Sequence, residues 1–247
     1  KVIELFYDVV SPYSWLGFEV MCRYRHVWNI ELKLCPAFLG GVMQGSGNKP
    51  PGVVPNKFMY MTKDLKRAAE YFDVPLQAPA DPFEVMFKKG SLSAMRFVTA
   101  VQEQEKGGDK LVEQVSRELW RRIWSEDKDI TEAASLAEVP TGPAWFYLER
   151  LISRLFCVCA QAAKKAGLSD GVIKDALETA ASKEIKDKLK DATQKALDYG
   201  AFGFPLLVYH RNGSPEIFFG SDRFELLAHC IGEKWLGPRP NNSAAKL

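Results

Sequence analysis

The sequence of 247 residues lacks the long apolar runs and the excess of one charge that mark two large classes of protein. No uncharged apolar stretch approaches the roughly 20 residues that a membrane-spanning helix needs. Basic residues number 33 and acidic residues 31, so the formal net charge is only +2. Because a dedicated nucleic-acid-binding protein usually carries a basic stripe, we predict neither a transmembrane segment nor a nucleic-acid partner.

The sequence also lacks the cysteine patterns of disulfide frameworks, redox dithiols and zinc sites. The five cysteines are scattered and odd in number, which favours a reducing compartment over a disulfide framework. No C-x-x-C motif occurs, so a redox dithiol at a helix start is absent. The close pair Cys157 and Cys159 has no second pair and no histidine nearby, and we therefore predict no metal site. P-loop, dinucleotide-binding and nucleophile-elbow motifs are absent as well.

The chain begins with a βαβ pattern. Apart from Glu4, residues 2–7 are β-branched, aromatic or leucine residues, which is typical of a buried strand. Ser11 and Pro12 then suit the N-cap and the first position of a helix, which continues to Val27. A second strand is expected over residues 30–34. Two strands joined through a helix should be parallel neighbours.

The middle of the chain divides into a loop and a helical block. Residues 40–57 are punctuated by glycine and proline, which predicts an irregular loop long enough to be functional. From residue 58 to residue 198 nearly every segment has apolar residues at helical spacing. Ser91 is expected to cap one of these helices.

The end of the chain returns to strands. Segments 206–210 and 216–219 flank an Asn-Gly turn, the strongest short signal for a hairpin. A last helix is expected to start at Ser221, with Asp222 in a capping box and Trp235 on the apolar face. The order of elements predicts an α/β fold: one mixed four-stranded sheet, with a large helical block inserted between its two halves.

Two sites at the predicted sheet have both a structural and a chemical interpretation. Ser11 stands where a strand meets a helix, and backbone N–H groups and the helix dipole favour an anion there. Its hydroxyl could donate to a bound thiolate, or it could only cap the helix. At the second site, a cis bond between Phe204 and Pro205 would let residue 204 offer its backbone to an extended ligand. A trans bond with an ordinary strand-start proline is the structural alternative.

Two further sites are open in the same way. Ser221 and Asp222 at a helix start could hold the carboxylate and the ammonium of an α-amino acid group, or they could only cap the helix. Asn48 and Lys57 could bind a peptide backbone and a terminal carboxylate, or they could be solvated loop residues.

Long strings in the sequence resemble the kappa class of glutathione transferases. The matching strings are ELFYDVVSPYSWLGFEV, GSGNKPPG, KGSLSAMRF, SRELWRRIWS, DITE, YGAFGFP and FGSDRFELLAHCIGEKWLGP. The resemblance covers about residues 1–137 and 162–247. It implies a thioredoxin-like domain over residues 1–60 and 196–247, an inserted all-helical domain over 61–195, and kinship with disulfide oxidases and 2-hydroxychromene-2-carboxylate isomerases.

The resemblance also implies roles for the candidate residues. Ser11 matches the family's catalytic serine, which hydrogen-bonds the sulfur of glutathione. Phe204 matches a residue whose backbone pairs with the cysteinyl part, and residues 221–222 match the holders of the γ-glutamyl end. The residues expected to bind glutathione are Ser11, Pro12, Tyr13, Asn48, Lys57, Phe204, Pro205, Ser221, Asp222 and, as a weaker candidate, Arg223.

The resemblance implies an enzyme that stabilises the glutathione thiolate for attack on an electrophile or a hydroperoxide. Glutathione is the co-substrate, no metal is expected, and the assembly should be a homodimer. Two alternatives stay open from the sequence. One is a glutathione-dependent isomerase of the 2-hydroxychromene-2-carboxylate type, and the other is a non-catalytic interaction protein on the same scaffold.

Two segments stand apart from this pattern. Residues 138–161 interrupt the family's sequence with an unusual composition, which we interpret as a splice variant or retained intron forming a poorly packed surface excursion. The tripeptide Ala245-Lys246-Leu247 resembles the peroxisomal address Ser-Lys-Leu. Because the family occurs in mitochondria and peroxisomes, we expect one or both of these locations.

Overall fold

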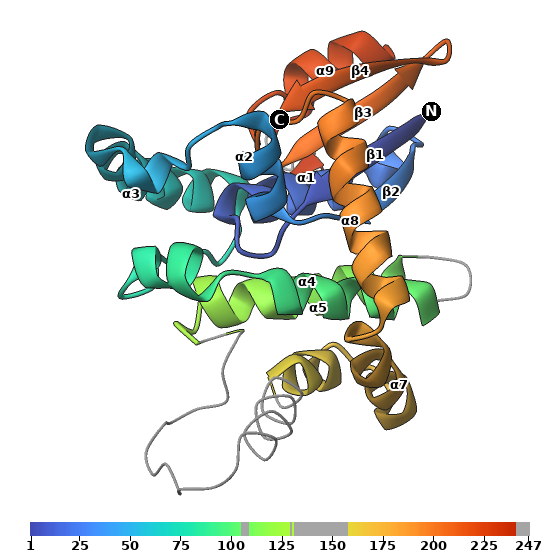
Figure 1. Cartoon of the computed structure of the whole chain (residues 1–247). Helices are drawn as coiled ribbons and strands as arrows, with labels where there is room; N and C mark the ends of the chain where they lie inside the picture. Colours follow the sequence, from blue (N-terminus) through green and yellow to red (C-terminus); the bar gives the residue numbers. More distant parts are fainter. Residues whose placement is uncertain (105–108, 129, 131–157, 241–247) are drawn as a thin grey trace, which may run out of the picture.

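A mixed four-stranded sheet lies at the centre of the fold. The computed structural model describes residues 1–104, 109–128, 130 and 158–240. The strands are β1 (Val2–Tyr7), β2 (Glu31–Pro36), β3 (Leu206–Arg211) and β4 (Ser214–Phe219), in the order β2-β1-β3-β4. β1 is parallel to β2 and antiparallel to β3. Figure 1 shows the two ends of the chain side by side in this sheet, so the predicted α/β sheet is confirmed.

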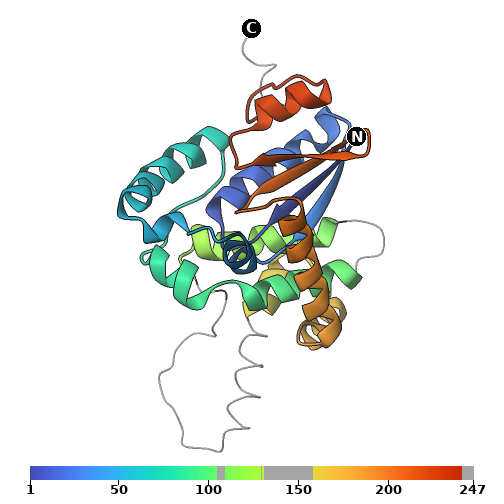
Figure 2. The ribbon, with the colours of Figure 1, turned by 45° about the horizontal axis from the view of Figure 1, so that its top comes forward.

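Helices account for most of the remaining chain. They are α1 (Pro12–Val27), α2 (Leu39–Ser46), α3 (Pro55–Phe72), α4 (Leu92–Gln104), α5 (Lys110–Trp124), α7 (Asp170–Ala180), α8 (Lys183–Asp198) and α9 (Phe224–Ile231), with a 3₁₀ turn η1 (Pro51–Val53) and a π-helix η2 (Glu84–Lys89). α4 and α5 pack together below the sheet, and α7 lies beyond them (Figures 1 and 2). In the described part of the chain, no helix is long and apolar enough to cross a membrane.

Strand β1 is buried on both of its faces, which explains why its sequence is apolar at every position except Glu4. Ile3, Leu5 and Tyr7 point into the main core, which α1, α4 and α5 share. Phe6 points the other way, into a smaller core with Val208 and residues of α8. Because a strand alternates its side chains between faces, β1 needs apolar residues at successive positions.

The predicted hairpin is confirmed. β3 and β4 pair in register from Leu206 opposite Phe219 to Arg211 opposite Ser214. The two residues between the strands, Asn212 and Gly213, have φ angles of 51° and 83°. Positive φ at both positions is what a type I′ turn requires.

The predicted loop over residues 40–57 is confirmed only for residues 47–54, which contain the short turn η1, and is wrong at both ends, because α2 occupies Leu39–Ser46 and α3 already starts at Pro55. The glycines of α2 have low intrinsic helix propensity, but they allow close packing against α8. A Cβ atom on Gly41 would lie 2.9 Å from Cγ2 of Thr193, and one on Gly45 would lie 2.6 Å from Cδ1 of Leu197. The helix α2 therefore forms because its packing against α8 outweighs the low helix propensity of its glycines.

The last helix is shorter than predicted at both ends. α9 begins at Phe224 after an N-cap residue, Arg223, that makes no side-chain capping bond. The predicted start at Ser221 with a capping box at Asp222 is therefore wrong. The helix ends before Gly232, and Trp235 lies beyond it, stacked on Tyr24 and Phe224.

The expected surface excursion over residues 138–161 falls mainly outside the described residues. Its last four residues are described, and residues 158–165 are helical. Val158 is 3% exposed and Cys159 is 1% exposed, within or beside the main core. The expectation of a poorly packed excursion is therefore wrong for the end of the segment, because this end is part of the core.

The division into two domains stays a prediction. Both expected boundaries, at residues 60/61 and 195/196, fall inside the long helices α3 and α8. The main core runs without a break from β1 and α1 to α4, α5 and α7.

Candidate active site

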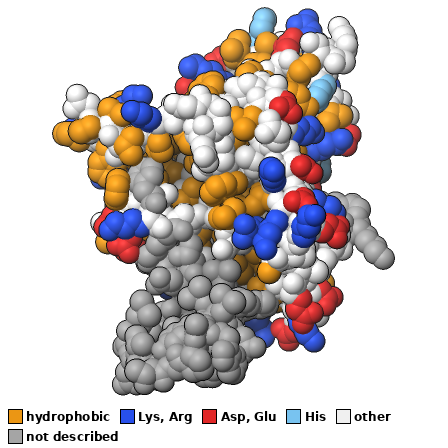
Figure 3. All heavy atoms as spheres, viewed as in Figure 1, with side chains coloured by type: hydrophobic (Ala, Val, Ile, Leu, Met, Phe, Trp, Pro, Cys, Tyr) orange, Lys and Arg blue, Asp and Glu red, His pale blue; other side chains and the backbone are white. Residues whose placement is uncertain are grey.

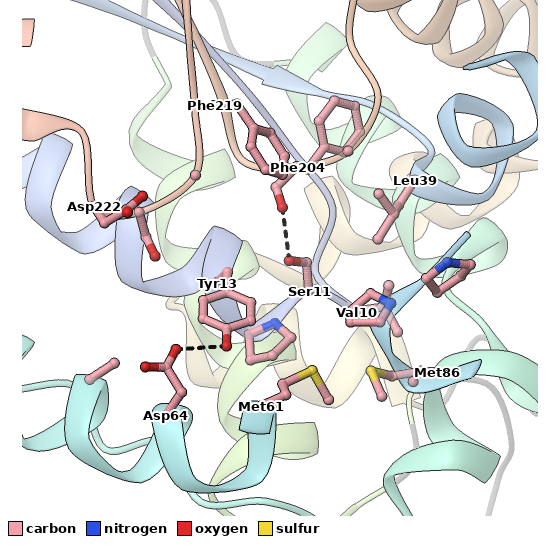
Figure 4. Close-up of a pocket in the computed structure, with 18 of the residues that line it drawn as sticks. Val10, Ser11, Tyr13, Leu39, Met61, Asp64, Met86, Phe204, Phe219 and Asp222 are labelled. Carbon is pink, nitrogen blue, oxygen red and sulfur yellow. Dashed lines mark hydrogen bonds between the residues drawn. The ribbon is translucent and has the colours of Figure 1, made fainter. Parts of the chain in front are cut away.

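A cleft of about 1190 Å³ opens where the start of α1, the cleft-facing side of α3 and the loops before β3 and α9 meet. All of the predicted site residues line it except Pro205 and Arg223. Figure 4 shows Ser11 in the middle of the cleft, with Phe204 on one side and Met61 on the other. The fold therefore brings together residues from both ends of the chain, as the sequence predicted.

Ser11 is the N-cap of α1 and also faces the cleft. Its Oγ accepts a hydrogen bond from the backbone N of Ser14 at 3.1 Å and donates to the carbonyl O of Phe204 at 3.5 Å. The second bond is at the outer limit of a hydrogen bond. A stronger acceptor in the cleft can therefore take the hydroxyl proton while the capping bond stays in place.

The backbone of Ser11 is held from two sides. Its N donates to the carbonyl O of Asp8 at 3.0 Å, and the indole Nε1 of the buried Trp120 donates to its carbonyl O at 3.1 Å. Trp120 belongs to α5, so the helical layer takes part in placing the hydroxyl. Sequence inspection offered no signal for this contact between distant segments.

Phe204 and Pro205 are joined by a cis peptide bond, the first of the two alternatives considered for this site. The carbonyl O of Phe204 points toward Ser11 (Figure 4). The carbonyl O of Pro205 accepts from the backbone N of Gly220. This hydrogen bond connects the residue before β3 to the loop before α9. Pro205 itself does not line the cleft.

Ser221 and Asp222 line the cleft just before α9. Ser221 is buried, whereas the side chain of Asp222 is 67% exposed. Arg223 does not line the cleft, and its Nη2 lies 3.6 Å from Oδ2 of Asp222 in an ion pair. The geometry therefore favours the first two residues as ligand contacts and leaves Arg223 as a neighbour of Asp222.

Asn48 and Lys57 also line the cleft, and both are exposed. The side-chain Nδ2 of Asn48 donates to the carbonyl O of Phe202 at 2.6 Å, and its Oδ1 accepts from the backbone N of Lys49. Asn48 thus bridges the loop after α2 to the loop before β3. Lys57 lies in the first turn of α3 and adds a positive charge to the lining of the cleft.

Asp64 is a site residue that sequence inspection missed. Its Oδ2 accepts from the hydroxyl of Tyr13 at 2.8 Å, and its Oδ1 accepts from the hydroxyl of Tyr60 at 3.2 Å. Burial and the neighbouring carboxylate of Asp64 both raise the pKa of Tyr13 above its ordinary value. The phenol therefore stays neutral and links α1 to α3.

The signal for Asp64 was its spacing along α3. Lys57, Tyr60, Asp64, Arg67 and Tyr71 follow one another at three or four residues and line the cleft on one face of the helix. Figure 3 shows hydrophobic side chains exposed over this helix. Tyr60 and Tyr71 are 62% and 56% exposed. Because the start of α3 was taken for a loop, this face was not recognised.

An apolar group of residues lies beside Ser11 in the close-up. Val10, Leu39, Met61 and Met86 surround the side of the hydroxyl away from Asp222 (Figure 4). The cleft thus has a polar end and an apolar region, with the Ser11 hydroxyl between them.

Comparisons with known proteins agree with this fold. The sequence matches the family described as DSBA-like thioredoxin domain over residues 2–141 and 157–232. It is 46% identical over 247 residues to glutathione S-transferase kappa 1 of Homo sapiens, covering 100% of this chain and 98% of that protein. The same protein of Rattus norvegicus is 45% identical over 247 residues, with the same coverage.

Solved structures show the same fold at low sequence identity. A 2-hydroxychromene-2-carboxylate isomerase superposes with a TM-score of 0.65 at 18% identity, covering 94% of this chain and 95% of that one. The cytosolic disulfide reductase DsbM from Pseudomonas aeruginosa with GSH superposes with a TM-score of 0.54 at 15% identity, covering 99% and 96%. These likenesses extend the fold beyond the close sequence relatives.

Proposed function

This chain belongs to the kappa class of glutathione S-transferases, and we propose that its cleft binds glutathione with the sulfur at Ser11. The observation that carries the proposal is the Ser11 hydroxyl. It stands at the N-terminus of α1, inside the cleft, with its proton held only by a 3.5 Å bond to Phe204. Such a group can donate to a thiolate without breaking the capping bond that fixes it.

The chemistry requires the thiolate, because the thiolate is the nucleophilic form of a thiol. A free thiol has a pKa of about 8.5, and lowering it by about two units needs roughly 2.7 kcal/mol of preferential stabilisation. A hydrogen bond to a charged acceptor contributes about 1.5–3 kcal/mol, and a helix N-terminus contributes about 0.3–2 kcal/mol. These two contributions suffice, so Ser11 stays protonated and forms no covalent intermediate.

The polar residues of the cleft suit the two ends of an extended glutathione. Ser221 and the carboxylate of Asp222 would take the γ-glutamyl carboxylate and ammonium. The backbone of Phe204 would pair with the cysteinyl part, and Lys57 with Asn48 would hold the terminal carboxylate. All five of these residues line the same cleft as Ser11, which supports this assignment.

The apolar residues beside Ser11 suit the second substrate. Ligand pockets usually measure about 300–1,000 Å³, and at about 1190 Å³ this cleft exceeds that range. We place an apolar electrophile against Val10, Leu39, Met61 and Met86, because these side chains carry no charge. The thiolate forms a C–S bond to the electrophilic carbon and the leaving group departs with the bonding electrons. With a hydroperoxide, the thiolate attacks the outer oxygen, and an S–O bond forms as the O–O bond breaks. The hydroperoxide is the two-electron oxidant: the sulfur becomes the sulfenic acid of glutathione, and the inner oxygen takes up a proton and leaves as an alcohol or water.

Proton release on binding tests the proposal. If the bound thiol has a pKa of about 6.5, binding glutathione at pH 7 releases about 0.7 proton per site. Calorimetry in buffers of different ionisation enthalpy measures this number, and S-methylglutathione, which has no thiol proton, is the matched control. Binding of glutathione without proton release, or no binding at all, would overturn the proposal.

We also propose that the chain forms a homodimer and acts in peroxisomes or mitochondria. The support is the family resemblance, together with the tripeptide Ala245–Leu247, which lies outside the described residues. Light scattering tests the assembly: a mass of 27.8 kDa at assay concentration would mean a monomer.

A further inference from the structure

One buried carboxylate, that of Asp8, connects three parts of the cleft wall. Asp8 follows the end of β1 and is fully buried. Its Oδ1 accepts a hydrogen bond from the backbone N of Val10 at 3.0 Å. Its Oδ2 accepts from the backbone N of Leu39 and from the hydroxyl of Ser91, both at 2.8 Å. Asp8 itself does not line the cleft, but all three of its donors do.

The three donors belong to segments far apart in the sequence. Val10 lies in the turn that carries Ser11, Leu39 is the first residue of α2, and Ser91 directly precedes α4. The carbonyl O of Asp8 also accepts from the backbone N of Ser11 at 3.0 Å. A shift of this one residue would therefore change the position of Ser11 relative to the walls on either side of it.

The environment of Asp8 suits the ionised form. From the turn and from α2 it faces backbone N–H groups, which can only donate, and from the segment before α4 it faces a hydroxyl that donates. In the described part of the chain, the influences on its pKa are burial and these three hydrogen bonds, with no contribution from a charged side chain. Burial raises its pKa to about 6, although the three hydrogen bonds favour the charged form. The carboxylate is therefore ionised at pH 7 and above.

We propose that Asp8 is a positioning residue of the glutathione site, which holds the Ser11 turn, the start of α2 and the segment before α4 in their binding arrangement. The proposal rests on the proposed function of Ser11, since it concerns the same cleft. Protonation of Asp8 would weaken all three bonds at once, because hydrogen bonds to a charged acceptor are the stronger ones. The cleft should then lose affinity for its ligand as the pH falls below about 6.

Binding of S-methylglutathione isolates this effect, because the ligand has no thiol that titrates. In the wild-type protein its Kd should rise as the pH falls from 7 to 5. Asp8→Asn keeps the size of the side chain but removes its charge. Its Kd at pH 7 should be about tenfold higher, which corresponds to the loss of one charge-assisted bond of about 1.4 kcal/mol. The Kd of this variant should no longer depend on pH between 5 and 7. Ser91→Ala removes one donor and should raise the Kd less while keeping the pH dependence.

A control variant separates positioning from general stability. Ile173→Ala removes a buried side chain of α7, which is not part of the cleft lining, and core truncations of this kind destabilise proteins by several kcal/mol. It should leave the Kd for S-methylglutathione and its pH dependence unchanged. If Ile173→Ala weakens binding as much as Asp8→Asn does, the effect is one of stability and the proposal fails.

Amide hydrogen exchange gives a second measurement that needs no ligand. The backbone amides of Val10 and Leu39 should exchange faster in Asp8→Asn, and in the wild type below pH 6 after correction for intrinsic rates. Unchanged exchange at both amides, or an unchanged Kd in Asp8→Asn, would overturn the proposal. A wild-type protein that binds no S-methylglutathione would instead contradict the proposed function, and exchange would still decide the role of Asp8. If Asp8→Asn does not fold, Ser91→Ala tests the proposal instead. An exchange rate of the Leu39 amide identical to that of the wild type would then contradict the positioning role of Asp8.

Discussion

Replacing Ser11 by alanine should raise the pKa of the bound glutathione thiol. The hydroxyl faces the cleft, and a hydrogen bond to a charged acceptor contributes about 1.5–3 kcal/mol. At 1.36 kcal/mol per pH unit, its loss corresponds to an upward shift of about one to two units. From a bound-thiol pKa of about 6.5, this shift should lower the thiolate fraction at pH 7, and with it the rate of conjugation, by about threefold to 25-fold. The Kd of S-methylglutathione should change little, because that ligand has no thiolate.

The assay is a titration of the bound thiolate by ultraviolet absorbance, alongside the pH profile of conjugation. Ser14→Ala is the matched control, because Ser14 is a buried serine of the same helix start whose hydroxyl has no hydrogen-bond partner. It should leave both profiles unchanged.

Loss of the N-cap must be distinguished from loss of the thiolate bond. Ser11→Ala also removes the acceptor for the backbone N of Ser14, which costs about 1 kcal/mol of stability. Ser11→Asp keeps a good N-cap but places a negative charge beside the sulfur, so it should restore stability and not activity. Recovery of activity in Ser11→Asp, or an unshifted thiol pKa in Ser11→Ala, would refute the assigned role.

Three further predictions follow from the described contacts. The double variant Ser221→Ala and Asp222→Asn should bind S-methylglutathione about tenfold more weakly or worse. Its melting temperature should stay nearly unchanged, because neither side chain caps α9. A large fall in melting temperature with unchanged binding would instead show a structural role for these residues. Burial alone would raise the pKa of Glu4, but hydrogen bonds from Lys195 and His210 hold this pKa below its ordinary value of 4.5. The ionised Glu4 therefore stabilises the folded state above about pH 4.5, and this contribution is lost as the pH falls further. Denaturant unfolding should therefore find Lys195→Met less stable than the wild type by up to about 1 kcal/mol at pH 7, because the half-exposed Lys195 side chain is screened by solvent. The difference should shrink toward pH 3, and an equal difference at both pH values would contradict the prediction. A fluorescent reporter that ends in residues 240–247 should enter peroxisomes, and a diffuse signal would refute the address.

The sequence was sufficient for features that depend on local pattern. The strand over residues 2–7, the N-cap at Ser11 and the Asn-Gly hairpin each have a short signature, and the structure has all three. The juxtaposition of Ser11 with Phe204 followed from the resemblance and from the predicted sheet. None of these features needed knowledge of contacts between distant segments beyond the order of strands.

What the sequence did not reveal depends on contacts across the fold. Helix α2 is rich in glycine and forms because close packing against α8 outweighs its low propensity. Asp8 is a single carboxylate without a local motif, and it accepts hydrogen bonds from Leu39 of α2 and from Ser91 before α4. Such a residue becomes recognisable only when the donors that surround it are known. Asp64 does share a helical spacing with other cleft residues, but its contact with Tyr13 of α1 depends on the fold.

Deletion of residues 142–156 tests the remaining interpretation of the atypical segment. These residues lie between the two parts that match the DSBA-like thioredoxin family, and none of them is a predicted site residue, so the deletion should leave binding of glutathione intact and raise solubility or melting temperature. The matched control is a deletion of equal length over residues 151–165, which also removes the helical residues 158–165 and the buried Cys159 and Ala162. It should abolish folding, because core residues of this kind stabilise the native state by several kcal/mol. Calorimetric binding and thermal melting of both variants decide the matter: if the 142–156 deletion also unfolds the protein, the segment is a required part of the helical domain and the splice-variant interpretation is wrong.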